Sequence, residues 1–451
     1  MAAEETAPGT AGSAAPGTSG GTAPGTADGA APAVRRPSWK KIGPGVVVAA
    51  TGVGAGDLVA TLVAGSKFGY TLLWAAVIGC IVKIALAEAT GRWHLATGRT
   101  IFDGWRGLGA WTTVYFAGYV VIWGFVYGAT AMSSSALPLQ ALFPDALPLK
   151  AWAVLTGLVG LLFVWTNRYA VVEKIMMAFV GVMFLVVVYV AIRVSPDLGD
   201  ALAGLVPVLP SGSLIYTLGL IGGVGGTITM AAYGYWINAK GWADSSWMRM
   251  MRLDNRVAYL TTGIFVVAML IIGAELLHSS HLALASGDKG LLDLESVLEE
   301  RFGSSTATLF LIGFFAASFS SLVGVWHGVS LMFADFVARL RAARGGPADA
   351  GVAPLARGEQ ERSLPFRGYL LWLTFPPMIL LWLDRPFGLV VAYGVLGAFF
   401  MPFLAATLLW LLNSERTPRE WRNGPVSNGL LGASCVLFVV LCVQQVRDLP
   451  W

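Results

Sequence analysis

Charged residues are scarce in this sequence of 451 residues. Aspartate, glutamate, lysine and arginine make up 12% of it, whereas hydrophobic residues make up 56%. A soluble protein carries about twice that share of charge. The mean hydropathy is +0.68, and apolar runs of about 20 residues, the length that crosses a bilayer as a helix, recur after residue 40. The composition therefore excludes a soluble protein and predicts an all-α integral membrane protein of the cell membrane.

Cysteine and the motifs of soluble enzymes are equally sparse. The three cysteines, Cys80, Cys435 and Cys442, stand singly in apolar segments, so no disulfide framework or CxxC metal site is expected. There is no phosphate-binding loop, HExxH or zinc-ligand spacing. Acids and histidines within the apolar runs are too few for a membrane enzyme. We therefore expect no enzyme activity, no cofactor and no nucleic-acid partner; the surrounding partner is membrane lipid, and no feature predicts an oligomeric state.

Large apolar residues are nearly absent from two segments. Residues 1–36 consist mainly of alanine, glycine, threonine and proline, which cannot bury enough surface to fold. They lack the continuous apolar stretch of a signal peptide. Residues 344–362 have a related composition. The sequence therefore predicts a disordered N-terminal tail, a transmembrane domain over 37–446 and a flexible cytoplasmic loop at 344–362.

The short loops between the apolar runs alternate in charge. Lysine and arginine gather in every second loop, as in "NSERTPREWRN", while the loops between them hold few basic residues and one of them, "GDKGLLDLESVLEER", is acidic. Positively charged loops mark the cytoplasmic side, so we expect the N-terminus inside and the C-terminus outside. The eleven expected spans are 45–66, 71–97, 111–136, 149–166, 171–194, 213–237, 257–279, 305–337, 367–384, 388–412 and 427–446.

Two of these spans are interrupted by glycines. "TGVGAGD" (residues 51–57) interrupts the first span and "GGVGGTITM" (residues 222–230) the sixth. Paired interruptions at corresponding positions are typical of transporters built from inverted repeats, where unwound backbone lines a midplane site. The alternative is close helix packing at the glycines. The pattern predicts repeats over 45–194 and 213–412, an extra helix at 427–446, and helices 1 and 6 unwound at the midplane.

Asp57 is a lone carboxylate at membrane depth. Such a group is costly in a bilayer and marks a functional site by default. We expect it to contact the transported cation or to pair with Lys83 of the second span. The other expected substrate contacts are Thr51, Gly54, Thr227, Met230, Ala231 and Tyr233, with Asp57 and Met230 as the metal ligands.

A few further ionisable residues fall inside or near the ends of spans. Lys83 and His327 are candidates for ion or proton coupling, although an ordinary buried histidine is the alternative for His327. Local helix pairs and an outer vestibule are expected from the remaining ones, which are Glu88 with Arg92, Asp335 with Arg339, and Glu275 with His278 and His281.

Several segments resemble the Nramp family of divalent-metal transporters. They are "GPGVVVAATGVGAGDLVATLVAGSKFGYTLLW", "LATGR", "GGTITM", "FFAASFSSLVGVWHG" and "FFMPFLAATLLW", which cover most of the hydrophobic sequence. The resemblance implies a LeuT-type fold of five plus five helices with the eleventh appended.

The residues that bind metal in that family are largely replaced here. Its first-helix motif, Asp-Pro-Gly-Asn, corresponds to residues 54–57, so that Gly54 stands at the acid and Asp57 at the amide. Its sixth-helix Met-Pro-His corresponds to residues 230–232, which keep Met230 alone. A glutamine of span ten corresponds to Gly394, and an acidic pair of span three to Ile122 and Phe125.

These small replacements predict an enlarged site with one carboxylate. Such a site suits a cation that keeps its water, as Mg²⁺ does, better than bare Mn²⁺ or Fe²⁺. It resembles the opened site of a related branch, the Nramp-related magnesium transporters. The expected function is thus a secondary transporter of a divalent cation working by alternating access. One alternative is a transporter of a small organic solute held by aromatic side chains, and another is a sensor that no longer transports.

Overall fold

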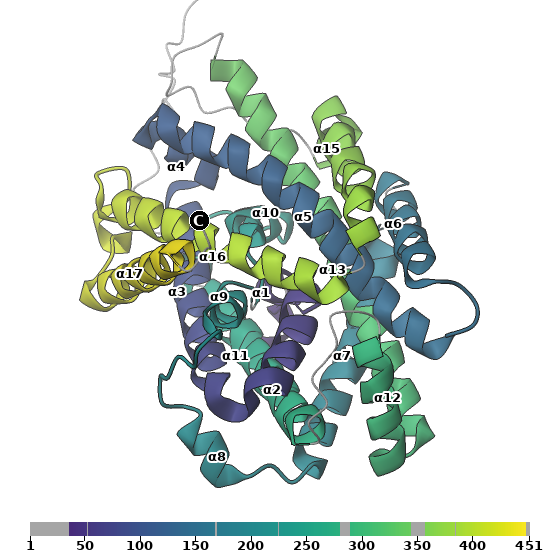
Figure 1. Ribbon diagram of the computed structural model, residues 1–451. Helices are drawn as coiled ribbons and strands as arrows, with labels where there is room; N and C mark the ends of the chain where they lie inside the picture. The colour runs from purple at the N-terminus through teal and green to yellow at the C-terminus, as the bar shows by residue number, and fades with distance from the viewer. Residues whose placement is uncertain are drawn as a thin grey trace, which may run out of the picture. The chain divides into compact units, whose positions relative to one another are not determined.

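Helices form every regular element that can be described in this computed structural model (Figure 1). The structure describes residues 36–447 except 52, 167–168, 224, 280–288, 344–356 and 384. The expected disordered tail up to residue 35 and His281 lie outside the described residues. So does most of the expected cytoplasmic loop, whose last six residues form a short helix, α14 (Arg357–Arg362).

The helices follow the expected spans closely. The first interrupted span holds α1 (Pro44–Ala50), a π-helix (Ala55–Ala60) and α2 (Thr61–Phe68). The sixth holds α9 (Leu214–Gly223), a 3-10 helix (Ile228–Ala232) and α10 (Tyr233–Ala239). The others are α3 (Leu73–Thr97), α4 (Ile101–Leu108), α5 (Ala110–Leu142), α6 (Leu149–Trp165), α7 (Tyr169–Arg193), α8 (Leu198–Ala203), α11 (Met248–Ile272), α12 (Lys289–Phe302), α13 (Ser304–Ala343), α15 (Leu364–Thr374), α16 (Pro386–Asn413) and α17 (Pro425–Arg447).

Eight helical stretches of the described chain are long and apolar enough to cross a membrane, and two shorter apolar helices accompany them. The expected total of eleven spans therefore stays a prediction. Several spans are longer than expected, and two of them extend into charged sequence. Helix α11 begins at Met248, well before the expected start at 257, and α13 continues to Ala343. Both extensions carry arginines, because a helix that leaves the bilayer can continue with charged residues in water.

Both predicted interruptions are present. In the first span, helix α1 ends at Ala50 and regular geometry resumes with the π-helix at Ala55, so that Asp57 lies in this π-helix rather than in the interruption. In the sixth span, α9 ends at Gly223, and Gly225 and Gly226 have φ angles of +68° and +91°. Only glycine adopts such angles without strain, which explains why this break is made of glycines.

Glycines also bring helix backbones into direct contact around the breaks. A Cβ on Gly394 of α16 would lie 2.6 Å from the Cα of Gly219 in α9, and one on Gly222 would lie 2.6 Å from the backbone nitrogen of Ala398. Figure 1 shows α16 passing over α9. The outer half of the first span packs in the same way, since a Cβ on Gly65 of α2 would meet the carbonyl oxygen of Leu270 in α11.

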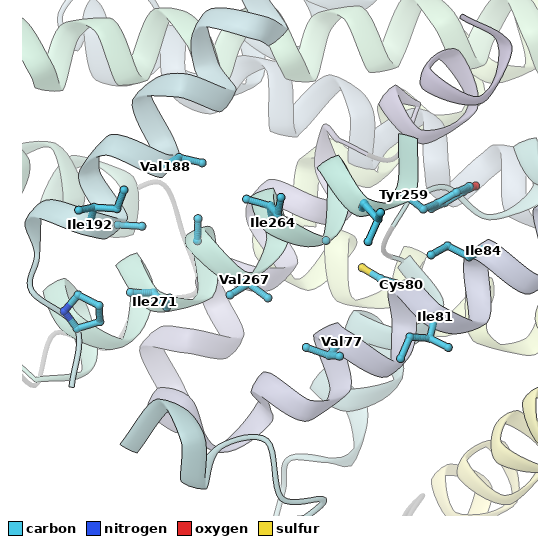
Figure 2. Close-up of a pocket in the computed structure, with 15 residues that line it drawn as sticks. Val77, Cys80, Ile81, Ile84, Val188, Ile192, Tyr259, Ile264, Val267 and Ile271 are labelled. Atoms are coloured by element: carbon cyan, nitrogen blue, oxygen red, sulfur yellow. The ribbon is translucent and has the colours of Figure 1, made fainter. Parts of the chain in front are cut away.

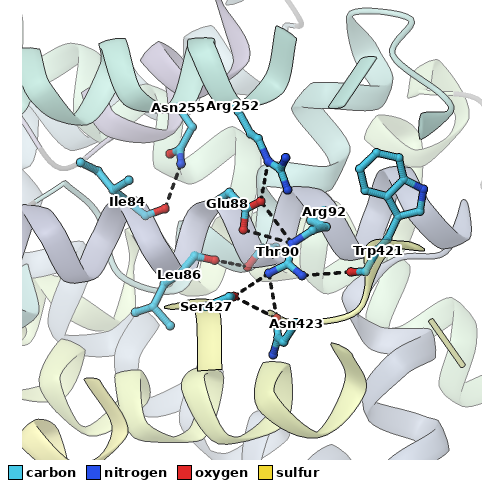
Figure 3. Close-up of polar contacts among 10 residues, drawn as sticks. All are labelled: Ile84, Leu86, Glu88, Thr90, Arg92, Arg252, Asn255, Trp421, Asn423 and Ser427. Atoms are coloured by element: carbon cyan, nitrogen blue, oxygen red, sulfur yellow. Dashed lines mark hydrogen bonds and ion pairs between the residues drawn. The ribbon is translucent and has the colours of Figure 1, made fainter. Parts of the chain in front are cut away.

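A polar network joins α3, α11 and the segment before α17 (Figure 3). The expected pair is present, with Arg92 Nε 3.1 Å from Glu88 Oε2. Glu88 also accepts from Arg252 Nε at 2.9 Å. Arg92 donates to the Trp421 carbonyl at 3.0 Å and to Asn423 at 2.8 Å. The pair is therefore an inter-helix junction rather than only a local helix contact.

Candidate substrate site at the two helix breaks

Hydroxyl groups from three segments of the chain meet at the first break. The Thr51 hydroxyl donates to the Val48 carbonyl at 2.5 Å and lies 2.9 Å from the hydroxyl of Thr229. Ser321 of α13 donates its hydroxyl proton to the Thr51 carbonyl at 2.5 Å. Thr51 thus joins the first break to the segment that follows the second, and its expected contact with a substrate stays a prediction. Its carbonyl, which was a candidate ligand, already accepts a bond from Ser321.

An aromatic cluster borders the second break. The indole nitrogen of Trp123 in α5 donates to Thr227 Oγ1 at 3.1 Å. The Trp123 ring stacks on Tyr127 with centroids 4.6 Å apart, and Tyr393 of α16 lies 5.3 Å from Tyr127. Tyr127 also donates to the Ser321 carbonyl at 3.3 Å. Three aromatic side chains that carry polar groups therefore lie along one side of the site.

Sequence reasoning missed this cluster. Trp123 and Tyr127 are one helical turn apart in the middle of an apolar span, whereas such residues usually lie at the membrane interfaces. Their N–H and O–H groups need partners when buried, so their central position was a usable signal. Ile122 and Phe125, compared above with the family's acidic pair, do not mark the interior: Ile122 is 58% exposed on the outer surface. The inward positions of α5 are those of Trp123 and Tyr127.

Lys83 lies fully buried behind the second break, with none of its surface exposed. Its ammonium group donates to the Gly222 carbonyl at 2.9 Å and also to the Gly226 carbonyl. The Gly222 carbonyl lies in the last turn of α9 and the Gly226 carbonyl lies just beyond its end, where the helix dipole favours positive charge. The ammonium group of Lys83 therefore caps the C-terminal end of α9. The side chain of Asp57 lies outside the described residues, so the expected contact between Asp57 and Lys83 stays a prediction.

The expected enlargement of the site is wrong at two of its three positions. A Cβ on Gly54 would lie only 2.6 Å from Cβ of Ser321, and Gly394 touches the backbone of Gly219. At the same helix face of α16, a Cβ on Gly397 would lie 2.5 Å from Cγ2 of Thr227. The physical reason is that neighbouring helices close onto glycines. The space that larger side chains would occupy is filled by backbone and by Ser321.

Met230 and Ala231 are buried in the 3-10 helix after the second break. Tyr233 was also expected to contact the substrate. Its hydroxyl group instead donates to Asp254 of α11 at 3.1 Å. Asp254 also accepts from the backbone nitrogens of Gly43 and Gly45 at 2.7 and 2.5 Å. The Tyr233 hydroxyl thus belongs to a network that ties the start of α1 to α11.

Two further polar contacts lie along α13. The expected pair of Asp335 and Arg339 is present at 2.7 Å, and Arg339 also contacts Asp103 of α4. Tyr235 of α10 donates to Asp335 at 2.5 Å, so this set, the α13 latch, joins three elements. His327 Nε2 lies 2.9 Å from Glu361 of α14.

Glu275 and His278, which were expected to form a vestibule with His281, line a separate cavity of about 440 Å³. Glu275 accepts a bond from Tyr70 at 2.7 Å, and His278 Nδ1 lies 3.1 Å from the Ser66 carbonyl. Across the described part of the chain, no group of three or more histidine, cysteine or acidic side chains is placed to hold a metal ion. The described side chains at the two breaks offer hydroxyl groups and the thioether of buried Met230.

Comparisons with known proteins agree on the family. The family model described as "Natural resistance-associated macrophage protein-like" (Nramp) matches residues 45–447. A divalent metal cation transporter MntH of Caldanaerobacter subterraneus is 23% identical over 421 residues, covering 89% of this chain and 91% of the relative. Another MntH, from Granulibacter bethesdensis, is 26% identical over 321 residues, with 64% and 67% covered.

Solved structures show the same fold. A manganese transporter of Eremococcus coleocola superposes with a TM-score of 0.69 at 16% identity, covering 89% of this chain and 85% of the other. Mhp1, a nucleobase-cation-symport-1 family transporter, superposes with a TM-score of 0.52 at 13% identity, covering 93% and 96%. The LeuT-type fold expected from the sequence is confirmed. The named relatives are transporters, which agrees with the expectation that the chain is not an enzyme.

Proposed function

Because the chain belongs to the Nramp family, we propose that it is a secondary transporter that moves a divalent metal cation across the membrane by alternating access. The substrate site in this proposal lies between the breaks of the first and sixth spans. The observation that carries it is the junction of Thr51 with Thr229 and Ser321, which brings both breaks and α13 to one point.

We further propose that the cation is Mg²⁺-like and keeps part of its water. The preference for Mg²⁺ follows from the type of ligand at the breaks and does not require an enlarged cavity. Hydroxyl and carbonyl oxygens surround the breaks, and such hard ligands suit Mg²⁺. Asp57 supplies the negative charge in this proposal, and Met230 is the one soft group. The manganese and divalent-metal activities named for the relatives belong to those proteins.

Lys83 has a specific part in the proposal. In discontinuous helices, unwound carbonyls and half-helix C-termini commonly coordinate a coupling ion. Here the ammonium group of Lys83 occupies the carbonyls of Gly222 and Gly226. We propose that this fixed cation takes the place of such an ion. A fixed positive charge beside the site also disfavours a fully dehydrated divalent ion, whose charge no shell of water would screen.

The alternating motion would require the inner contacts to open. The α13 latch joins α4, α10 and α13, and the pair of His327 with Glu361 joins α13 to α14. We propose that these contacts hold the cytoplasmic side closed. His327 remains the candidate for proton coupling in this proposal, and its contact with Glu361 places it between α13 and α14.

The test is uptake by proteoliposomes containing the full-length protein. We expect Mg²⁺ to enter faster than Mn²⁺ at equal gradients, and Asp57→Ala to abolish uptake of both. The matched control is Asp145→Asn, which removes a carboxylate from an exposed loop position and should leave uptake unchanged. Failure of every divalent ion to bind or move at millimolar concentration would overturn the proposal. Faster uptake of Mn²⁺ would overturn the Mg²⁺ preference alone.

A small organic solute is the second candidate substrate, because Trp123, Tyr127 and Tyr393 border the second break. Aromatic faces bind organic cations by cation–π attraction. Uptake of an organic cation that Trp123→Ala abolishes, together with no uptake of metal ions, would favour this candidate. If nothing is moved and Asp57→Ala changes only ligand binding, the protein is a sensor.

A further inference from the structure

An apolar groove runs along the outer surface of the helix bundle, between α3, α7 and α11 (Figure 2). Its volume is about 560 Å³. Apolar side chains line almost all of it, and several of them are exposed: Leu260 by 60%, Ile264 by 54% and Ile81 by 48%. In a membrane protein such a surface faces acyl chains. The groove therefore has the chemistry of a site for a hydrocarbon chain.

A basic pocket of about 440 Å³ adjoins the groove, because Ile81 and Ile84 line both. Four arginines and one glutamate, Glu88, line this second cavity: Arg92, Arg252, Arg256 and Arg422. The excess of positive charge favours an anionic group.

Of the four arginines, Arg256 and Arg422 are the two whose positive charge is available to a ligand. Arg92 and Arg252 share Glu88, as Figure 3 shows. No carboxylate among the described residues lies within ion-pair distance of Arg256 or Arg422. Arg256 is also exposed to the surroundings of the bundle. The positive charge of the pocket is therefore concentrated at these two side chains.

Helices α3 and α11 line both the groove and the basic pocket, and they run antiparallel, so that the apolar parts of both helices lie together and so do their charged parts. Asn255 of α11 donates to the Ile84 carbonyl of α3 at 2.9 Å, while a Cβ on Gly263 would lie 3.3 Å from Sγ of Cys80. On α11, positions 252, 256, 260 and 264 are four residues apart and so share one face. That face carries arginine at positions 252 and 256, and leucine and isoleucine at 260 and 264. On α3, positions 88, 84, 81 and 77 change from acidic to apolar in the same direction.

The length of the apolar part matches one leaflet. From Leu260 to Ile271 the rise of an α-helix amounts to about 16 Å, which is close to half of the roughly 30 Å hydrocarbon core. An apolar groove that spans one leaflet places Arg256, one turn beyond Leu260, at the level of the lipid headgroups. Arginine pockets between membrane helices are known to bind anionic headgroups.

We propose that this composite groove binds an anionic phospholipid. Its phosphate group lies against Arg256 and Arg422, and one acyl chain runs along Leu260, Ile264 and Val267. The lipid then bridges α3, α11 and the segment before α17. Lys83 of α3 contacts the sixth span, and Asp254 of α11 contacts the first. A lipid in the groove therefore touches both helices that contact the interrupted spans.

The experiment uses full-length protein in nanodiscs of equal parts phosphatidylglycerol and phosphatidylcholine, followed by native mass spectrometry in mild detergent. The wild-type protein should retain phosphatidylglycerol in preference to phosphatidylcholine. Arg256→Gln should lower the retained phosphatidylglycerol about fivefold, the effect of one basic residue near a membrane surface. Ile264→Trp should lower it as well, because the indole ring fills the apolar groove without changing any charge.

Matched controls distinguish the groove from general effects. Arg341→Gln removes an exposed arginine from α13, and Ile379→Trp adds an indole at another exposed apolar position. Both should retain the wild-type amount of phosphatidylglycerol. Equal retention of the two lipids by the wild-type protein would overturn the proposal. So would loss in Arg256→Gln with wild-type retention in Ile264→Trp, because that result describes an anion site without a chain.

Discussion

Lys83 illustrates how one side chain can complete a broken helix. A helix that stops inside a membrane leaves carbonyls without partners, and water is not there to supply them. The ammonium group of Lys83 fills this role for Gly222 and Gly226. A buried charge is tolerated here because the carbonyls and the dipole of α9 replace part of its lost hydration.

Replacement of Lys83 by methionine should therefore destabilise the protein. The two carbonyls lose a charged donor, which costs about 2–3 kcal/mol, and the midpoint of thermal unfolding in detergent should fall. Lys83→Gln keeps N–H donors without the charge and should cost less. Lys40→Met, at an exposed position, is the control and should leave the midpoint unchanged. Equal midpoints for Lys83→Met and the wild-type protein would show that the ammonium group is dispensable.

Gly54 tests whether the family's acid position has room for a side chain. A Cβ there would lie 2.6 Å from Cβ of Ser321, so Gly54→Ala should lower the free energy of unfolding by about 1–3 kcal/mol. Ser321→Gly removes the obstructing atoms, and the double variant should cost less than the sum of the two single changes. Strict additivity in this double-mutant cycle would contradict the close packing.

At the scale of single residues, sequence reasoning was uneven. Glu88 with Arg92 and Asp335 with Arg339 were predictable because helical spacing alone brings such pairs together. The bonds of Lys83 to span six and of Trp123 to Thr227 depend on tertiary packing, which no local spacing reveals. The prediction of an enlarged site was wrong for the same reason, since the sequence does not show that Ser321 fills the space beside Gly54.

At the scale of elements, glycines set how closely helices approach. Helices α9 and α16 touch through Gly219 and Gly394, with no side chain between them. The two interrupted spans were predictable because their glycine clusters are local and occupy corresponding places in the sequence. The partner that each cluster packs against was not predictable, because it comes from a distant span.

Gly394→Ala should separate α9 from α16. Its methyl group would meet backbone atoms that cannot move aside as a side chain could, and we expect a loss of about 1–3 kcal/mol in stability. Thermal unfolding in detergent measures it. Gly432→Ala on α17 is the matched control, because a Cβ there meets nothing within 4 Å. If both variants unfold at the same midpoint, the contact of α9 with α16 is looser than described.

At the scale of the whole molecule, the fold was the most predictable property. Its class follows from composition and from the number and spacing of apolar runs, which are global features and tolerate local error. Orientation in the membrane and the count of eleven spans remain predictions from charge and hydropathy. The substrate is the least predictable property, because it depends on a few atoms at the breaks.

The α13 latch should control exposure of the cytoplasmic side. Arg339→Gln leaves Asp103 and Asp335 without their shared cation, and removing one member of a buried ion pair costs about 3–5 kcal/mol. We expect faster hydrogen exchange in α4 and α10, measured by mass spectrometry. Adding Asp335→Asn should restore part of the protection. Unchanged exchange in both helices would show that the latch does not hold them.

The two halves of the first span are anchored by different means. Helix α1 is attached to α11 through hydrogen bonds that Gly43 and Gly45 donate to a single carboxylate, Asp254. Helix α2 meets α11 backbone against backbone at Gly65. The backbones of α1 and α11 also come close at Gly45, where a Cβ would lie 3.0 Å from the Asp254 carbonyl oxygen. Removing the Asp254 carboxylate should therefore weaken the attachment of α1 to α11 and leave that of α2 unchanged, a difference that hydrogen exchange in the two halves would measure.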